Sequence, residues 1–236
     1  MKRLMALVLA AVVTLLPFTA LAGSGYTEFP KSAIAYMEIK YRCGCTRVGT
    51  GAMICANGLI TAGHNLVCEK HHKTAKNIVF YFGYKSKSNY FYKYDDECSY
   101  WYFDSFKNGY QSKDDIGYVR FKRDVGKTTG WFATRYAGDA EFKGKSCRIG
   151  AYSSSGSLTI HSATLSVSSS KLFTFNKKEL PYGGEGAPIF IYRNNVATLV
   201  GVYNSHTSTK CVGRRLTQGV FDDMAKNLRF ERIYRN

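Results

Sequence analysis

Short segments rich in β-branched and aromatic residues recur along most of the chain, separated by glycine, asparagine and serine. Segments of this length and composition are typical of strands joined by turns. Only residues 221–233 show helical spacing, with Phe221, Met224 or Ala225, and Leu228 on one face. The pattern predicts an all-β barrel or sandwich followed by a helix. The predicted strands are 33–41, 51–54, 59–61, 78–84, 116–121, 147–152, 159–167, 172–175, 188–192 and 197–203.

The stretch 85–111, which is dense in Tyr, Lys and Asp, fits a long loop or a surface hairpin. The first 22 residues have the organisation of a secretory signal peptide. Lys2 and Arg3 precede an apolar run over 4–16, and Ala-Leu-Ala at 20–22 resembles a cleavage site. We therefore expect a secreted or periplasmic protein. No later apolar run reaches the roughly 18 residues that a membrane-spanning helix needs, so the sequence predicts no transmembrane segment.

The chain is strongly basic, with 33 Lys and Arg against 17 Asp and Glu. Without Lys2 and Arg3 the count is 31 basic against 17 acidic residues, a net charge of +14. Such a charge attracts anionic surfaces and polyanions. The alternative is a merely solvated basic surface, because the cations are dispersed and form no block of five. A hydrophobic content of 45% excludes a disordered chain.

Seven cysteines lie beyond the predicted leader, and export permits disulfide bonds. An odd number leaves at least one unpaired. Cys55 and Cys68 bracket a short turn-rich segment, so we expect that bridge first. Two groups of residues raise the alternative of a metal site, Cys43-Gly44-Cys45 and Cys68 with His71 and His72. Neither spacing matches a structural zinc pattern, so the sequence predicts no metal and no cofactor.

Three short segments bring together residue types that hydrolases use. A predicted strand ends in Thr-Ala-Gly-His64, and Asp115 stands directly before another strand. An acid so placed can accept a hydrogen bond from the imidazole and fix its tautomer. Further along, Gly183, Gly184 and Gly186 surround Glu185. Glycines in a tight loop let backbone N–H groups converge on one point, as an oxyanion hole requires. Each segment alone also fits ordinary turn chemistry; their order favours a catalytic arrangement.

Four motifs of the chain are GTGAMI…ITAGHNL at 49–66, DDIGYVRF at 114–121, GGEGAPIF at 183–190 and LVGVYNSH at 199–206. In this order they resemble the motifs of the chymotrypsin-fold serine proteases. The similarity is greatest to the secreted bacterial glutamyl endopeptidase branch. The resemblance implies two antiparallel β-barrels with the site in the cleft between them. We expect the first barrel over 23–125, and the second barrel with the terminal helix over 126–236.

The resemblance also implies roles for the residues of the three segments. His64 matches the general base, Asp115 matches the orienting acid better than Asp114, and the turn 183–186 matches the oxyanion turn. Glu185 stands where the family has its nucleophilic serine. A carboxylate with a pKa of about 4.3 is a poor nucleophile toward amides, and its charge lies where the oxyanion would form. We expect its side chain to pair with His64 or to fill the oxyanion hole.

Substrate preference depends on a pocket that the resemblance places near Glu179, Tyr203 and His206. Tyr203 stands where the glutamyl branch usually has a histidine, so glutamyl preference does not follow. Two functions remain. The first is an inactive protease homologue, a monomer that binds a peptide or protein in the inter-barrel cleft, or an anionic surface. The alternative is a serine-type endopeptidase with weak or altered hydrolysis.

Overall fold

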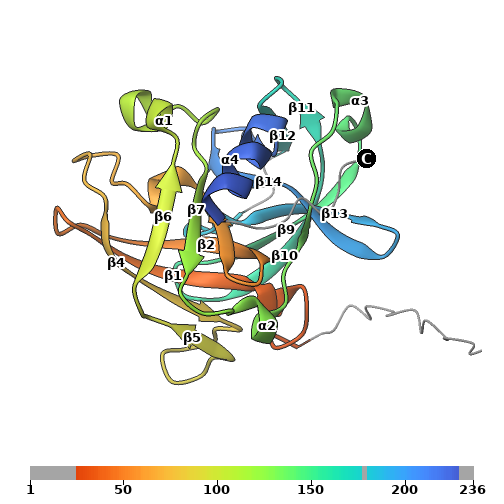
Figure 1. The fold of residues 1–236 in the computed structure, drawn as a ribbon. Coiled ribbons are helices and arrows are strands. Elements are labelled where there is room, and N and C mark those ends of the chain that lie inside the picture. Colours follow the sequence, from red (N-terminus) through yellow and green to blue (C-terminus); the bar gives the residue numbers. More distant parts are fainter. Residues whose placement is uncertain (1–24, 177–179, 229–236) are drawn as a thin grey trace, which may run out of the picture.

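The computed structural model describes residues 25–176 and 180–228. Two curled antiparallel sheets make up most of the molecule, and the chain completes the first sheet before it enters the second (Figure 1). The predicted all-β architecture of two half-barrels with a C-terminal helix is confirmed. The predicted signal peptide, residues 1–22, lies outside the described residues.

The first sheet has seven strands in the order β5-β4-β1-β2-β3-β7-β6. Its central strand pairs are antiparallel, with β1 between β4 and β2. The strands are β1 (Ile34–Tyr41), β2 (Thr46–Cys55), β3 (Gly58–Thr61), β4 (Ala75–Phe82), β5 (Tyr92–Tyr94), β6 (Cys98–Tyr102) and β7 (Gly117–Phe121).

The second sheet has the order β10-β9-β13-β14-β15-β12-β11, and β8 pairs with β14 in parallel. Along β9 the residues from Ser146 to Ile149 alternate between exposed and buried, as expected for a strand with one face on a core. The strands are β8 (Ala133–Thr134), β9 (Ser146–Tyr152), β10 (Leu158–Thr164), β11 (Ser166–Val167), β12 (Leu172–Asn176), β13 (Pro188–Arg193), β14 (Val196–His206) and β15 (Lys210–Arg215).

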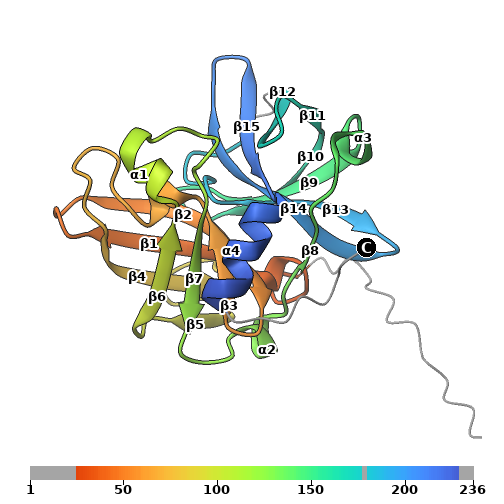
Figure 2. The ribbon, with the colours of Figure 1, turned by 45° about the horizontal axis from the view of Figure 1, so that its top comes forward.

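The C-terminal helix α4 (Gln218–Leu228) returns from the second sheet to the first. It begins three residues before the predicted start, and residues 229–233 of the prediction lie outside the described part. Val220, Phe221, Met224 and Leu228 are buried, and Figure 2 shows the helix beside β7. The short helices are η1 (Lys31–Ala33), η2 (Gly63–Asn65), α1 (Asp104–Gly109), α2 (Gly126–Thr129) and α3 (Asp139–Phe142). Within the described ranges, no helix has the length and apolar character to cross a membrane.

The stretch 85–111 is more than a decorated loop, because it contributes β5 and β6 to the first sheet. Trp101 on β6 lies opposite Tyr118 on β7, and Tyr94 on β5 is fully buried. Its aromatic side chains are therefore partly core residues, although lysine and aspartate separate them in the sequence.

A cluster of tyrosines joins the two sheets. The ring of Tyr36 on β1 stacks on Tyr84 with the centroids 4.4 Å apart, and it meets the edge of Tyr152 on β9 at 5.6 Å. The Tyr152 hydroxyl accepts a hydrogen bond from the backbone N–H of Tyr84 at 3.0 Å. Buried aromatic rings with satisfied hydroxyls pack closely, so the two half-barrels share one core at their junction.

Candidate active site

His64 lies in η2, directly after β3, and its side chain is buried. Its ring Nδ1 lies 2.8 Å from Asp115 Oδ2, and its backbone N–H donates to Asp115 Oδ1 at 2.9 Å. The Tyr41 hydroxyl donates to the His64 carbonyl at 2.6 Å. The Asp115 carboxylate therefore binds both the backbone N–H and the ring of His64, which fixes the orientation of the imidazole. The opposite ring nitrogen, Nε2, has no hydrogen-bond partner.

The structure distinguishes the two adjacent acids before β7. Asp115 contacts His64, whereas Asp114 forms an ion pair of 3.3 Å with Lys171. Asp115, and not Asp114, therefore lies within hydrogen-bond distance of the His64 ring.

Asn204 on β14 positions the loop that carries Asp115, a role that sequence reasoning missed. Its Nδ2 donates to the carbonyls of Asp115 at 2.8 Å and Ser112 at 2.9 Å, and its Oδ1 accepts from the Arg214 N–H at 3.1 Å. The register of β14 against β15 shifts between Tyr203 and Ser205. Such an irregularity re-aims a side chain. The only sequence signal is a polar residue inside an apolar strand.

The loop 183–186 is folded tightly at two glycines. Gly183 has φ +97° and Gly186 has φ +93°, a left-handed conformation that favours glycine. A Cβ at Gly186 would also collide with the Thr50 carbonyl oxygen. The Gly186 N–H donates to the Tyr203 carbonyl at 2.7 Å, which ties the loop to the second sheet. These positions require glycine for conformation and for close packing.

The backbone of Glu185 is anchored to the first sheet. Its carbonyl accepts hydrogen bonds from the Thr50 N–H at 2.9 Å and from Asn65 Nδ2 at 3.0 Å. Asn65 directly follows His64 in η2. The element that carries the imidazole therefore also holds the loop that carries Glu185, so the segments singled out in the sequence meet at the junction of the sheets.

The Glu185 carboxylate contacts its own loop instead of the imidazole. Its Oε2 accepts a hydrogen bond from the Gly183 N–H at 3.2 Å, and the residue as a whole is only 7% exposed. The predicted ion pair with His64 is wrong, since His64 Nε2 has no hydrogen-bond partner. The left-handed turn at Gly183 explains this, because it leaves a backbone N–H within reach of the Glu185 carboxylate. A backbone donor therefore satisfies the carboxylate locally.

Of the three candidate specificity residues, the structure describes Tyr203 and His206, and these two lie side by side. Tyr203 is fully buried among the second sheet's core residues, and its hydroxyl lies 3.0 Å from Nδ1 of the exposed His206. Burial is the main reason why the pKa of Tyr203 is raised above its ordinary value, so this phenol stays protonated. Glu179 lies outside the described residues.

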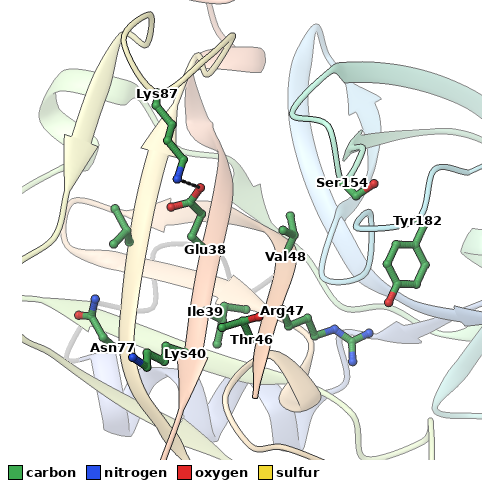
Figure 3. A pocket seen from close by; sticks show the side chains of 11 residues that line it. Glu38, Ile39, Lys40, Thr46, Arg47, Val48, Asn77, Lys87, Ser154 and Tyr182 are labelled. Atoms are coloured by element: carbon green, nitrogen blue, oxygen red, sulfur yellow. Dashed lines mark ion pairs between the residues drawn. The ribbon is translucent and has the colours of Figure 1, made fainter. Parts of the chain in front are cut away.

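A groove of about 480 Å³ runs beside the loop 183–186. The outer faces of β1, β2 and β4 form one wall, and Figure 3 shows Ser154 and Tyr182 across from them. Tyr182 directly precedes the loop and is 73% exposed. Lys87 pairs with Glu38 at 3.7 Å inside the groove. Arg47 also lines it, so the groove combines an exposed aromatic ring with positive charge.

No disulfide joins any of the seven cysteines, all of which lie in the described ranges. The expected Cys55–Cys68 bridge is not formed: Cys55 Sγ lies 3.8 Å from the Asn57 side chain, and Cys68 lies beside Cys43 and Cys45. Cys147 is buried in the second sheet's core, and burial raises the pKa of its thiol to about 12. The structure brings Cys43, Cys45, Cys68 and His71 together, against the sequence expectation, and leaves His72 against the Tyr110 ring.

Comparison with known proteins gives structural neighbours only, because no family model and no curated protein matches the chain. A Glu endopeptidase, solved in complex with MPD, superimposes with a TM-score of 0.75 at 18% identity, over 88% of this chain and 95% of that one. The protease Anisep from Arthrobacter nicotinovorans gives 0.70 at 14% identity, over 84% and 96%. An inactivated protease paralogue of the scabies mite gives 0.64 at 14% identity, over 86% and 96%.

These likenesses extend over most of each chain and define the fold. The two antiparallel half-barrels and the helix form the chymotrypsin-like fold of the trypsin-like serine proteases.

Proposed function

We propose that the protein is a secreted or periplasmic binding protein with a trypsin-like protease fold and without ordinary peptidase activity. The observation that carries the proposal is the side chain of Glu185. The resemblance assigns position 185 to the nucleophile, and the Glu185 carboxylate accepts a hydrogen bond from the Gly183 N–H. The site therefore lacks the hydroxyl that should attack, and the Gly183 N–H, a backbone donor that should stabilise the oxyanion, is already occupied.

The expected loss of activity is large for physical reasons. A serine hydroxyl that loses its proton to histidine forms an ester that water later cleaves. If a carboxylate attacked an amide, the adduct would expel the carboxylate more readily than the amine. Removing one oxyanion donor alone costs about 10²–10³ in kcat. The Glu185 charge also lies where negative charge would develop, which opposes the transition state.

The groove supplies a binding surface for the proposed function. Lys40 and Arg47 line its wall, and Tyr182 stands at the opposite side. An extended peptide with acidic side chains could pair with the cations and stack on the exposed ring. The net charge of +14 would draw such a ligand, or an anionic surface, from a distance. We propose a monomer whose ligand is a peptide or protein segment of this chemistry.

A second candidate function, weak or altered endopeptidase activity, is favoured by the geometry of His64. Its pairing with Asp115 is intact at 2.8 Å, and its Nε2 has no hydrogen-bond partner. An imidazole held in this way can activate water directly. A protease active site that lacks one member of the triad still accelerates hydrolysis about 10³–10⁴-fold over the uncatalysed rate.

Hydrolysis of a broad fluorogenic peptide library distinguishes the two candidates. The parent protein and His64→Ala should be equally inactive if the protein only binds. Glu185→Ser should gain cleavage that depends on His64, because the pairing of His64 with Asp115 is in place. If the parent cleaves peptides and His64→Ala abolishes the cleavage, the second candidate is correct.

Binding is measured separately on an array of acidic and neutral peptides. Arg47→Ala should weaken retention of the acidic peptides, and higher salt should do the same, because the Debye length falls from about 10 Å at 0.1 M to about 3 Å at 1 M. Lys76→Ala, on β4 outside the groove lining, is the matched charge control. Absence of retention even at low salt would contradict the binding role.

A further inference from the structure

Four metal-ligating side chains converge on one point outside the candidate active site. They come from two loops of the first half-barrel: Cys43 and Cys45 lie on the turn between β1 and β2, and Cys68 and His71 lie between η2 and β4. The three sulfur atoms and a histidine nitrogen all lie within 4.8 Å of one another. We propose that these residues bind one zinc ion in a Cys₃His site.

Two sulfur–nitrogen distances in the cluster agree with tetrahedral zinc coordination. His71 Nδ1 lies 3.4 Å from Cys45 Sγ and 3.7 Å from Cys68 Sγ. Zinc binds sulfur at about 2.3 Å and imidazole nitrogen at about 2.0–2.1 Å, so neighbouring sulfur and nitrogen ligands of a tetrahedron lie about 3.6 Å apart. A hydrogen bond from the ring to one thiol would account for one of these distances. It would not gather three thiols around the same nitrogen.

The donor set favours zinc. Three thiolates and one neutral imidazole form a closed, four-ligand site of the kind that structural zinc occupies, whereas magnesium and calcium require oxygen ligands. Such a site carries a net charge of −1. Arg42 and Lys70 each stand next to a ligand in the sequence, and Glu69, which stands next to Cys68, pairs with Arg47 at 3.7 Å. Cys68 is buried and His71 is exposed, so the site lies at the surface with one protected side.

Backbone hydrogen bonds hold both loops in place without the ion. The Tyr41 N–H donates to the Cys45 carbonyl at 2.9 Å, and Gly44 adopts φ +90° within that turn. In the second loop the Cys68 N–H donates to the Lys73 carbonyl at 2.8 Å. The Arg42 N–H then joins the two loops by donating to the Thr74 carbonyl at 3.0 Å. The ligands are therefore preorganised, which reduces the entropy cost of binding.

The position of the site gives it a structural consequence. The Tyr41 hydroxyl donates to the His64 carbonyl, and Cys68 follows His64 by four residues. A zinc ion would fasten the β1–β2 turn to the segment that leaves η2. It would support the element that carries the imidazole without touching it, so the proposal does not depend on the function proposed for the active site.

A disulfide is the competing fate of the same thiols. Pairing Cys68 with Cys43 or Cys45 would use two sulfur atoms and leave the third thiol and the imidazole without a shared partner. Zinc uses all four donors. Thiolate ligands must also be deprotonated, so zinc affinity should fall as the pH is lowered.

Zinc content and affinity of the purified full-length protein test the proposal. Reduced, chelator-treated protein is titrated with Zn²⁺ against a chromophoric chelator, and Co²⁺ is added separately as a spectroscopic probe. We expect one Zn²⁺ per chain. With Co²⁺ we expect the visible absorption of a tetrahedral ion and a thiolate charge-transfer band. The Co²⁺ spectrum needs no variant, so it is unaffected by any folding defect.

Matched variants separate ligands from neighbours. Cys45→Ser and His71→Ala should weaken Zn²⁺ binding by more than about 100-fold, beyond the roughly 10–100-fold that loss of a residue supporting a ligand costs. Cys55→Ser and His72→Ala remove a thiol and an imidazole outside the cluster, and they should bind as the parent does. The proposal is overturned if the reduced parent takes up no Zn²⁺ or if His71→Ala binds as tightly as His72→Ala. A disulfide among Cys43, Cys45 and Cys68 in protein isolated and alkylated without reductant would overturn it as well.

Discussion

Asn204→Ala tests whether the second sheet holds the loop of Asp115. The Asn204 side chain is completely buried and makes three hydrogen bonds, to the carbonyls of Asp115 and Ser112 and to the Arg214 N–H. Alanine removes all three and leaves three backbone groups without that partner. A buried group left unsatisfied costs about 1–3 kcal/mol. The Ser112 carbonyl still accepts the Asp115 N–H at 3.4 Å. For the other two groups together, we expect the free energy of unfolding to fall by about 2–6 kcal/mol.

Urea unfolding followed by tryptophan fluorescence measures this loss. With a typical slope of about 2 kcal/mol/M, the midpoint should fall by about 2 M. Asn77→Ala, at an exposed position of β4, is the matched control and should change the free energy by no more than about 0.5 kcal/mol. If Asn204→Ala is no more destabilising than this control, the argument that β14 anchors the Asp115 loop is refuted.

Two further predictions concern the glycine loop and an ion pair. Gly186→Ala should lower the melting temperature strongly, because Gly186 has a positive φ and an added Cβ would collide with Thr50. Gly219→Ala in α4 is the control and should be neutral or stabilising, because no heavy atom lies near the added Cβ. Equal melting temperatures for the two variants would contradict the packing argument. Arg135 hydrogen-bonds both carboxylate oxygens of Glu141 and lowers its pKa below 4.5, so Glu141→Gln should cost up to about 1 kcal/mol at pH 7. The stabilisation by this ion pair is present above the unfolded pKa of Glu141 and is lost as the pH falls through its folded pKa. Urea titrations measure the difference in unfolding free energy between Glu141→Gln and the parent, and a difference that persists at pH 2 would refute the ion-pair contribution.

The strands that sequence reasoning predicted include β1 and β14, which are rich in β-branched and aromatic residues. It missed β15 because Lys210, Arg214 and Arg215 mark that segment as exposed. In the structure both arginines are buried, and Arg215 pairs with Asp139 from a distant helix at 2.5 Å. A partner so far away in the chain cannot be predicted from local composition.

In the candidate site, too, some features could be predicted from local sequence and others could not. His64 and Asp115 belong to local motifs, and the structure places them within hydrogen-bond distance. Whether the Glu185 carboxylate contacts His64 or the Gly183 N–H depends on backbone dihedral angles, which cannot be read from the local sequence. The convergence of the cysteine cluster depends on how two loops pack, so spacing rules alone pointed away from it.

We propose that residue 185 occupies the nucleophile position beside the paired His64 and Asp115. Reaction with a fluorophosphonate probe, read by intact mass and peptide mapping, tests it without knowledge of a substrate. The parent and Glu185→Ala should remain unlabelled, whereas Glu185→Ser should gain one adduct at position 185 that is lost when His64→Ala is added. If Glu185→Ser reacts no faster than Glu185→Ala, or if its labelling does not depend on His64, the claim is contradicted.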